Sequence, residues 1–261
     1  MKDIIQSLWI GDELSKVEQL CIASFLTNGS PFHLYTYSDV KNIPTGTIIK
    51  DANDIIPSSE IFRLNNGSYA VFADWFRFEM LYKVGGFYVD MDMICMKPFD
   101  FEHEEVVFGK EIMDSVSNAI MKFPKGSDVC RFMADMSMEP NTFLSDDSWK
   151  DKRRKIKRKY FKGNRRKDVK WGETAGPLGF SNYLKHIGKF EEAKAFTYFF
   201  PVHPGNLVTF FDDTFHNNMT FFNGSYTAHL WNEMLRRKNI DKNSTFTEHS
   251  FFEQLKRKYL S

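Results

Sequence analysis

The sequence has few cysteines, no long apolar run and almost no net charge. Its 261 residues include three cysteines, whose spacing fits neither a disulfide framework nor a zinc site, so we expect a reducing compartment. No stretch reaches the roughly 18 apolar residues of a membrane-spanning helix, and the N-terminus lacks the apolar core of a signal peptide. A net charge of +1 gives no strong global field. These absences lead us to expect a cytoplasmic protein.

Aromatic residues, in contrast, are abundant. Phe occurs 27 times, while the shares of hydrophobic residues (42%) and charged residues (26%) are close to globular averages. A chain of this length buries roughly 70–75% of its unfolded surface, so it needs no stapling crosslinks. The composition therefore predicts a large packed core and argues against disorder of the whole chain.

Strand patterns alternate with helical patterns along the chain. We expect strands at residues 4–10, 32–37, 48–49, 87–89, 106–108, 195–200 and 226–231. We expect a first helix that is capped by Asp12 or Ser15 and runs to about residue 26, and further helices at residues 68–84, 128–138, 176–186 and 248–259. The alternation predicts an α/β fold with a parallel-type sheet, and no boundary divides residues 1–261 into separate domains.

Two carboxylates follow one of the predicted strands directly. A glycine pair ends the helix at 68–84, the strand at 87–89 follows, and Asp90-Met91-Asp92 comes next. The backbone turns where the strand ends, so both carboxylates can converge on one hard cation such as Mg²⁺ or Mn²⁺. A cation there can bridge the phosphates of a nucleotide-sugar and stabilise the departing diphosphate. A lone Asp-x-Asp also occurs in ordinary turns, so its context decides.

The context of this motif resembles a known family. Asp74 and Arg77 are three residues apart on the predicted helix, and Leu-Tyr, Gly-Gly, an aromatic residue and Asp-x-Asp follow within residues 73–92. The run resembles the DXD-containing sugar transferases of glycosyltransferase family 32. That family includes mannosyltransferases, Gb3-synthase-like enzymes and bacterial capsule or O-antigen enzymes, and clostridial toxin glucosyltransferase domains share its core. Without the resemblance, Asp74 and Arg77 read as a surface ion pair.

Weaker resemblances extend along the chain in the family's order. The opening strand ends in Trp9-Ile10-Gly11, Gly176 begins a Gly-Pro segment, and His229 precedes Trp231 in a late His-x-Trp segment. The chain departs from the family pattern at residues 75–76 and in the basic run at 150–170. These departures leave the identity of the donor and of the acceptor open. They do not affect the predicted class of enzyme, because neither departure touches a carboxylate.

The resemblance implies a single GT-A type domain with helical additions and a metal-dependent, retaining transfer. Asp92 would ligate the cation, and Asp90 would bind the cation or the nucleotide ribose. Arg77 would offset phosphate charge, and these three are the expected catalytic residues. Mn²⁺ or Mg²⁺ is the implied cofactor, and His229 would complete the metal site, although a lone histidine is more often structural.

The resemblance also implies a donor site. Trp9 would stack on the base and Ile10 would offer backbone groups to its edge, although Trp9 also reads as a core residue. Asp74 and Arg77 would contact the sugar and diphosphate, with Gly176 and Trp231 nearby. UDP-glucose or UDP-galactose is favoured over GDP-mannose by family analogy alone. The expected acceptor is a glycan or lipid-linked glycan in bacterial surface polysaccharide synthesis.

Residues 150–170 break the composition, with thirteen Lys or Arg against two Asp. We interpret them as a basic insertion that is either a solvated surface or a contact with an anionic membrane, which would place the protein at the inner face of the cell membrane. A non-catalytic nucleic-acid-binding protein built on this run is a rival function. A haloacid-dehalogenase-like phosphatase, in which the first Asp is a nucleophile, and a transferase that binds donor without turnover are two further rivals.

Overall fold

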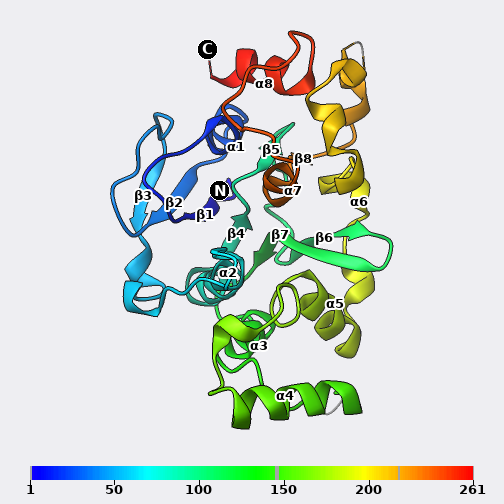
Figure 1. The fold of residues 1–261 in the computed structure, drawn as a ribbon. Helices are drawn as coiled ribbons and strands as arrows, with labels where there is room; N and C mark the ends of the chain where they lie inside the picture. Colours follow the sequence, from blue (N-terminus) through cyan, green and yellow to red (C-terminus); the bar gives the residue numbers. More distant parts are fainter. Residues whose placement is uncertain (1, 145–146, 217, 261) are drawn as a thin grey trace.

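A six-stranded sheet forms the centre of the protein in the computed structural model, which describes residues 2–144, 147–216 and 218–260 (Figure 1). The strands lie in the order β3-β2-β1-β4-β7-β6. Their bounds are β1 (Ile5–Trp9), β2 (Phe32–Thr36), β3 (Ile48–Asp51), β4 (Gly86–Val89), β6 (Val107–Ile112) and β7 (Ser115–Phe123). Strands β3, β2, β1 and β4 pair in parallel, whereas β7 is antiparallel to both β4 and β6.

Helices cover both faces of this sheet, and a two-stranded ribbon stands beside it (Figure 1). The ribbon pairs β5 (Met93–Cys95) with β8 (Thr227–His229). The helices are α1 (Lys16–Thr27), α2 (Ala70–Val84), α3 (Asp128–Met138), α4 (Trp149–Phe161), α5 (Pro177–His186), α6 (Phe196–Phe199), α7 (Asn232–Arg237) and α8 (Phe251–Tyr259). Single turns of 3₁₀ helix occupy several connections. No helix among the described residues is long and apolar enough to cross a bilayer.

The alternation of side chains along each strand divides the core into two layers. On β4, Phe87 and Val89 face a cluster with α1 and α8, while Tyr88 faces a second cluster with α2, α3 and α5. The first cluster holds many of the chain's phenylalanines, which meet in edge-on and tilted pairs such as Phe222 with Phe251. The mixed α/β architecture confirms the predicted fold class and is consistent with the expected GT-A type.

Local sequence explains how the two central helices begin and end. Ser15 caps α1, and the carboxylate of Glu18 accepts from the backbone N–H of Ser15, so a capping box fixes the start of the helix. Helix α2 ends at Gly85, whose φ of 76° favours glycine. A Cβ at Gly85 would also lie 2.6 Å from the backbone nitrogen of Lys125. The chain therefore needs glycine here to turn from α2 into β4.

Parallel pairing places the carboxyl ends of four strands along one edge of the sheet. Trp9, Thr36, Asp51 and Val89 close β1, β2, β3 and β4 respectively. In α/β sheets this edge is where ligands bind, because the chain leaves each strand there and the loops diverge. The Asp-x-Asp motif follows the end of β4 and therefore stands on this edge.

Two of the predicted strands differ in the structure. Residues 195–200 were expected to be a strand, and that prediction is wrong: they form the short helix α6, with Phe199 and Phe200 buried in the aromatic cluster. Packing of these rings overrides the β propensity of their sequence. The strand expected at 226–231 is confirmed only as β8, because Trp231 adopts a left-handed backbone that ends it.

Candidate functional site

The loop that carries Asp90 and Asp92 is held between two strands. The backbone N–H of Asp90 donates to the carbonyl of Ala119 on β7 at 2.7 Å. The carbonyl of Asp92 accepts from the N–H of Leu230, just past β8, at 2.9 Å. The two carboxylates are thereby fixed between the central sheet and the β5–β8 ribbon.

Arg77 of α2 lies between two carboxylates. Its Nη2 is 3.0 Å from Asp90 Oδ1 and 3.5 Å from Asp74 Oδ1, and its Nη1 donates to the carbonyl of Asn118 at 2.6 Å. The guanidinium also lies over the ring of Tyr88, 4.8 Å from the centroid. Asp74 and Arg77 are buried, so the surface ion pair considered from sequence is replaced by a buried one.

Burial governs the acidity of these carboxylates. Burial raises the pKa of Asp90, while Arg77 opposes the shift and the charge of Asp92 adds to it. Burial likewise raises the pKa of Asp74 against Arg77 and Asn118. Asp90 keeps 29% of its side chain exposed, so its carboxylate reaches the surface of the protein.

Asn118 on β7 is a site residue that sequence reasoning missed. Its Nδ2 donates to Asp74 Oδ1 at 2.8 Å and to the carbonyl of Ala175 at 2.9 Å. A Cβ at Gly176 would lie 3.0 Å from Asp74 Oδ2 and 2.5 Å from Gly172, so only glycine fits there. Asn118 and Gly176 together hold the Gly-Pro segment against Asp74.

Asp92 contacts the segment that follows β8. Its Oδ1 is 3.1 Å from His229 Nε2, and its Oδ2 accepts from the backbone N–H of Asn232 at 2.6 Å. Burial alone would raise the pKa of Asp92, but His229, the Asn232 N–H and Lys242 together lower it. Asp92 is therefore ionised at neutral pH. Burial lowers and Asp92 raises the pKa of His229, and the net shift is upward.

Trp231 covers the imidazole of His229 with its ring. The two ring centroids are 3.9 Å apart, and the indole Nε1 donates to the carbonyl of Val202 at 3.4 Å. The backbone of Trp231 is left-handed, with φ 57° and ψ 59°. A bulky residue adopts this region rarely, and it costs on the order of 1–3 kcal/mol, so surrounding contacts hold it.

Glu18 joins α1 to this corner of the site. The side chain is fully buried, its Oε1 accepts from Asn232 Nδ2 at 3.0 Å, and Lys242 forms an ion pair with it. Lys242 also lies 5.7 Å from the ring centroid of Trp9. One buried carboxylate thus connects Trp9 at the end of β1 with the residues around Asp92.

Trp9 and Ile10 stand beside this network at the end of β1. Trp9 is half-buried, and its indole Nε1 has no hydrogen-bond partner among the described residues. A Cβ at Gly11 would lie 3.1 Å from that nitrogen. Ile10 is half-buried and packs against the second core cluster. The indole N–H is thus buried against Gly11 without a partner in the described part of the chain.

Two family descriptions match the chain. The glycosyltransferase sugar-binding region containing the DXD motif matches residues 18–114, which span Asp74, Arg77, Asp90 and Asp92. The chain thus carries the sugar-binding region of DXD-type sugar transferases. The conserved region of alpha 1,4-glycosyltransferases matches residues 189–259, which include β8 and α7. The two matched regions supply opposite sides of the site described above.

Other comparisons of the chain with known proteins are distant. A solved structure titled PaToxG Glycosyltransferase is 15% identical over 100% of this chain and 86% of that chain, with a TM-score of 0.49. A structure of a transferase mutant is 12% identical over 62% of this chain and 86% of that chain, with a TM-score of 0.38. A comparison with curated proteins finds no match. The family matches therefore carry the assignment.

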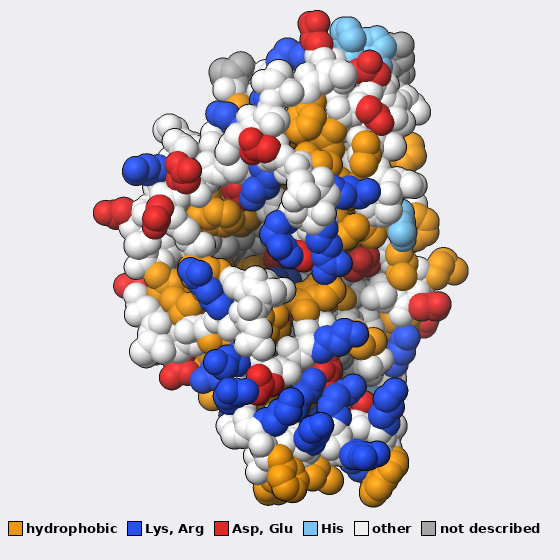
Figure 2. Space-filling view, viewed as in Figure 1, with side chains coloured by type: hydrophobic (Ala, Val, Ile, Leu, Met, Phe, Trp, Pro, Cys, Tyr) orange, Lys and Arg blue, Asp and Glu red, His pale blue; other side chains and the backbone are white. Residues whose placement is uncertain are grey.

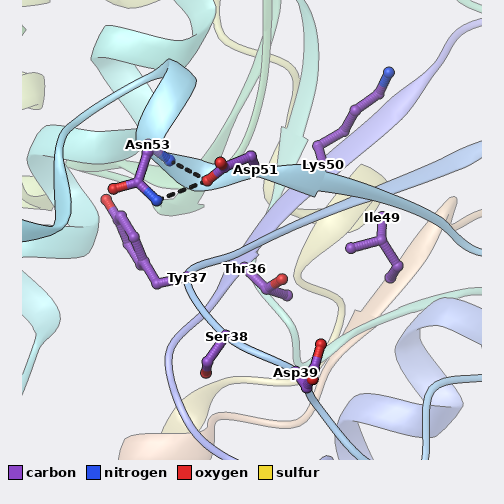
Figure 3. Close-up of a pocket in the computed structure, with 8 residues that line it drawn as sticks. All are labelled: Thr36, Tyr37, Ser38, Asp39, Ile49, Lys50, Asp51 and Asn53. Atoms are coloured by element: carbon purple, nitrogen blue, oxygen red, sulfur yellow. Dashed lines mark hydrogen bonds between the residues drawn. The ribbon is translucent and has the colours of Figure 1, made fainter.

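A pocket of about 550 Å³ opens beyond the end of β2 (Figure 3). Its lining residues come from the end of β2 and from β3 with the turn after it: Thr36, Tyr37, Ser38, Asp39, Ile49, Lys50, Asp51 and Asn53. Asp51 accepts from the backbone and the side chain of Asn53 at 2.8 and 2.7 Å, which lowers its pKa. The pocket adds polar groups that sequence reasoning did not select.

Glu111 on β6 is a further carboxylate that sequence reasoning missed. Burial raises its pKa, while His229 and His203 lie close enough for their charges to oppose the shift. No sequence motif includes Glu111. Only the fold, which brings β6 and β8 to one side of the site, could reveal it.

The expected metal ligands of the DXD motif are divided between two partners. Asp90 faces Arg77 and Asp92 faces His229, and the described residues contain no ready cluster of three His, Cys, Asp or Glu around one point. The donor set nevertheless fits a divalent cation. Asp92 is ionised, and His229 is buried with an Nδ1 that has no hydrogen-bond partner among the described residues. Oxygen donors with one imidazole suit Mn²⁺ better than Mg²⁺.

Proposed function

We propose that the protein is a metal-dependent glycosyltransferase of one GT-A type domain that moves a hexose from a nucleotide-sugar to a glycan acceptor with retention. The observation that carries the proposal is that two ion pairs, Arg77 with Asp90 and His229 with Asp92, stand at the carboxyl edge of the sheet. These groups come from α2, from the loop after β4 and from β8, and both family matches contribute to them.

The charges of this site suit a diphosphate leaving group. Arg77 is always protonated, and its buried contacts with Asp90 and Asn118 fix its direction. A preorganised cation of this kind stabilises charge that develops on a departing phosphate. Asp74 is held by Asn118 and Gly176, and its free lone pairs can accept from sugar hydroxyls. The chain thus has separate groups for the phosphate and for the sugar.

Asp92, His229 and Asp90 are the residues that would hold the cation. A bound Mn²⁺ or Mg²⁺ supplies Lewis-acid stabilisation of the diphosphate charge. Glu18 and the Asn232 N–H keep Asp92 and the start of α7 in place, so that Asp92 need not reorganise on binding. The ring of Trp231 excludes water from one side of His229.

The nucleoside end of the donor would lie along the sheet edge towards Trp9. The face of the half-buried indole ring suits stacking on a base, and the backbone of Ile10 offers groups to its edge. Asp39 and Asp51 in the neighbouring pocket can accept from ribose hydroxyls. Family analogy favours UDP-glucose or UDP-galactose and a role in bacterial surface polysaccharide synthesis.

Retention leaves the acceptor proton without a dedicated protein base. The departing phosphate oxygen would take that proton, and Glu111 stands nearby to support positive charge on the sugar ring as its bond breaks. The anomeric configuration of an isolated product, read by NMR, distinguishes retention from inversion.

The test is a screen of donor hydrolysis with nucleotide-sugars in the presence of Mn²⁺. We expect release of free nucleotide from one donor, loss of release with a chelator, and a loss of about 10²–10³-fold in Asp92→Asn. Asp135→Asn is the matched control, because Asp135 is exposed on α3 and its ion pair is with the exposed Arg131. Equal hydrolysis by wild type and Asp92→Asn would contradict the proposal.

A further inference from the structure

Helix α4 carries an apolar stripe on its outward side. Ile156 and Tyr160 follow Trp149 by seven and eleven residues, which places all three on one helical face. Their side chains are 39%, 66% and 79% exposed in the order Ile156, Tyr160 and Trp149. Phe161, at the end of the helix, is also 79% exposed. Large aromatic side chains in such numbers on one short surface mark an interaction site.

The opposite face of α4 is tied to the protein by ion pairs. Lys155 and Asp147 are both buried, with 2.7 Å between Lys155 Nζ and Asp147 Oδ1. Arg158 donates from both terminal nitrogens to the two carboxylate oxygens of Glu173, at 2.9 and 3.1 Å. Arg154 joins Glu173 as well, at 2.9 Å. The helix is therefore held by its polar side, and its apolar stripe points away from the core.

Unpaired cations flank the stripe. Among the described residues, five cations of α4 have no ion pair: Lys150, Lys152, Arg153, Lys157 and Lys159. Lys152 and Lys159 lie on one side of the stripe, and Arg153 and Lys157 on the other. Figure 2 shows Lys and Arg gathered over the end of the molecule where Figure 1 places α4, with hydrophobic side chains at its tips.

We propose that the outward face of α4 docks the protein onto an anionic lipid bilayer. Apolar and aromatic side chains along the centre, with cations on both flanks, are the arrangement by which a helix lies in the headgroup region. Trp and Tyr suit this boundary because their rings are apolar and their tips polar. Each cation near an anionic surface adds attraction that salt screens.

The same features fit a nucleic acid less well. A strand binder needs a basic groove along which successive bases stack. Here Ile156 occupies the middle of the exposed stripe, and the aromatic residues stand at the two ends of a convex helix. Nucleic-acid binding is therefore the competing outcome of the test.

The test is flotation of the full chain with vesicles of phosphatidylcholine alone or with about one third phosphatidylglycerol. We expect flotation with the anionic vesicles only, and release when NaCl rises from about 0.1 M to about 1 M, since the Debye length falls from about 10 Å to about 3 Å. Binding to neutral and anionic vesicles alike, or to neither, overturns the proposal. Binding to an RNA or DNA oligonucleotide without vesicle binding also overturns it.

Two double variants separate the contributions of the cations and of the apolar stripe to vesicle binding. Lys152→Gln with Arg153→Gln should weaken anionic-vesicle binding about 30-fold, and Trp149→Ala with Tyr160→Ala should weaken it at least tenfold. The matched controls, Lys238→Gln with Arg257→Gln and Val208→Ala with Phe221→Ala, change exposed residues outside α4 and should bind like wild type. Equal losses in the variants and their controls contradict a site on α4.

A spectroscopic signal reports the contact directly. Trp149 is one of five tryptophans, and its emission is obtained by subtracting the spectrum of Trp149→Phe from that of the wild type. We expect this difference spectrum to shift to shorter wavelength with anionic vesicles, because the ring leaves water. No shift during flotation would overturn docking through this face. Donor hydrolysis plays no part in either measurement, so failure here leaves the proposed transferase activity untouched.

Discussion

Charged side chains gather in two regions of the molecule, the site beside β4 and the helix α4. The two regions differ in how deeply these side chains are buried. Beside β4, Arg77 is buried and contacts Asp74 and Asp90 in a fixed geometry. On α4, Lys157 is exposed and has no ion pair among the described residues. The same charge is thus held by the fold in one region and offered to the surroundings in the other.

This difference shows why a count of charges in a sequence says little about their roles. A buried cation costs several kcal/mol to desolvate and persists only with its partners. An exposed cation contributes little to stability and keeps its charge available for a partner of opposite sign. Substitutions in the two regions should therefore affect different measurements.

The largest effect on stability is expected for Arg77→Met. Removal of the guanidinium leaves Asp74 and Asp90 without their cation, so the free energy of unfolding should fall by about 3–5 kcal/mol. Urea unfolding measures it. Arg131→Met is the control, because its pair with Asp135 is 60% and 62% exposed, and it should change stability by less than about 1 kcal/mol. Similar losses in both variants would remove the contrast between buried and exposed pairs.

An intermediate effect is expected for Lys155→Met, which tests the buried face of α4. Asp147 would lose two contacts of 2.7 and 2.8 Å, so the free energy of unfolding should fall by about 1.5–3 kcal/mol. The same urea titration, followed by circular dichroism, measures the loss. A change below about 0.5 kcal/mol would show that α4 is not anchored by this pair.

The smallest effect on stability is expected for Lys157→Ala on the outward side of the same helix. The free energy of unfolding should change by no more than about 0.5 kcal/mol. Anionic-vesicle binding should nevertheless weaken about fivefold, from the loss of roughly 1 kcal/mol of attraction. A variant that loses stability but keeps vesicle binding would reverse the roles assigned to the two faces.

The sequence predicted most of the fold because its local signals agree with the final packing. The glycine pair after α2 and the apolar run of β4 each mark a boundary that the structure confirms, and of the two expected caps of α1 the structure has Ser15. The strand β7 was missed, since its nine residues mix polar and apolar side chains and are buried on both sides by partners far away in sequence. The strand expected at 195–200 was wrong for a related reason, because distant rings decide how those residues pack.

The sequence predicted those site residues that belong to one continuous motif. Asp74, Arg77, Asp90 and Asp92 lie within nineteen residues of each other, and their contacts follow from a helix, a turn and a strand. Asn118, Glu18 and Glu111 take part through side chains that only the fold brings near. No local pattern marks these residues, since Asn118 is 44 positions from Asp74 and Glu18 is 214 positions from Asn232. The catalytic and metal-binding roles of the motif residues stay predictions.

The left-handed backbone of Trp231 affects how any substitution of this residue is read. Exchange for glycine deletes the indole ring but also relieves the unfavourable torsion angles of the main chain. The stability lost with the ring and the stability gained from the backbone therefore partly cancel in the melting temperature. Alanine deletes the same ring and keeps the unfavourable torsion angles. Comparison of Trp231→Gly with Trp231→Ala therefore separates the stability contributed by the indole ring from the energetic cost of the left-handed backbone at this position.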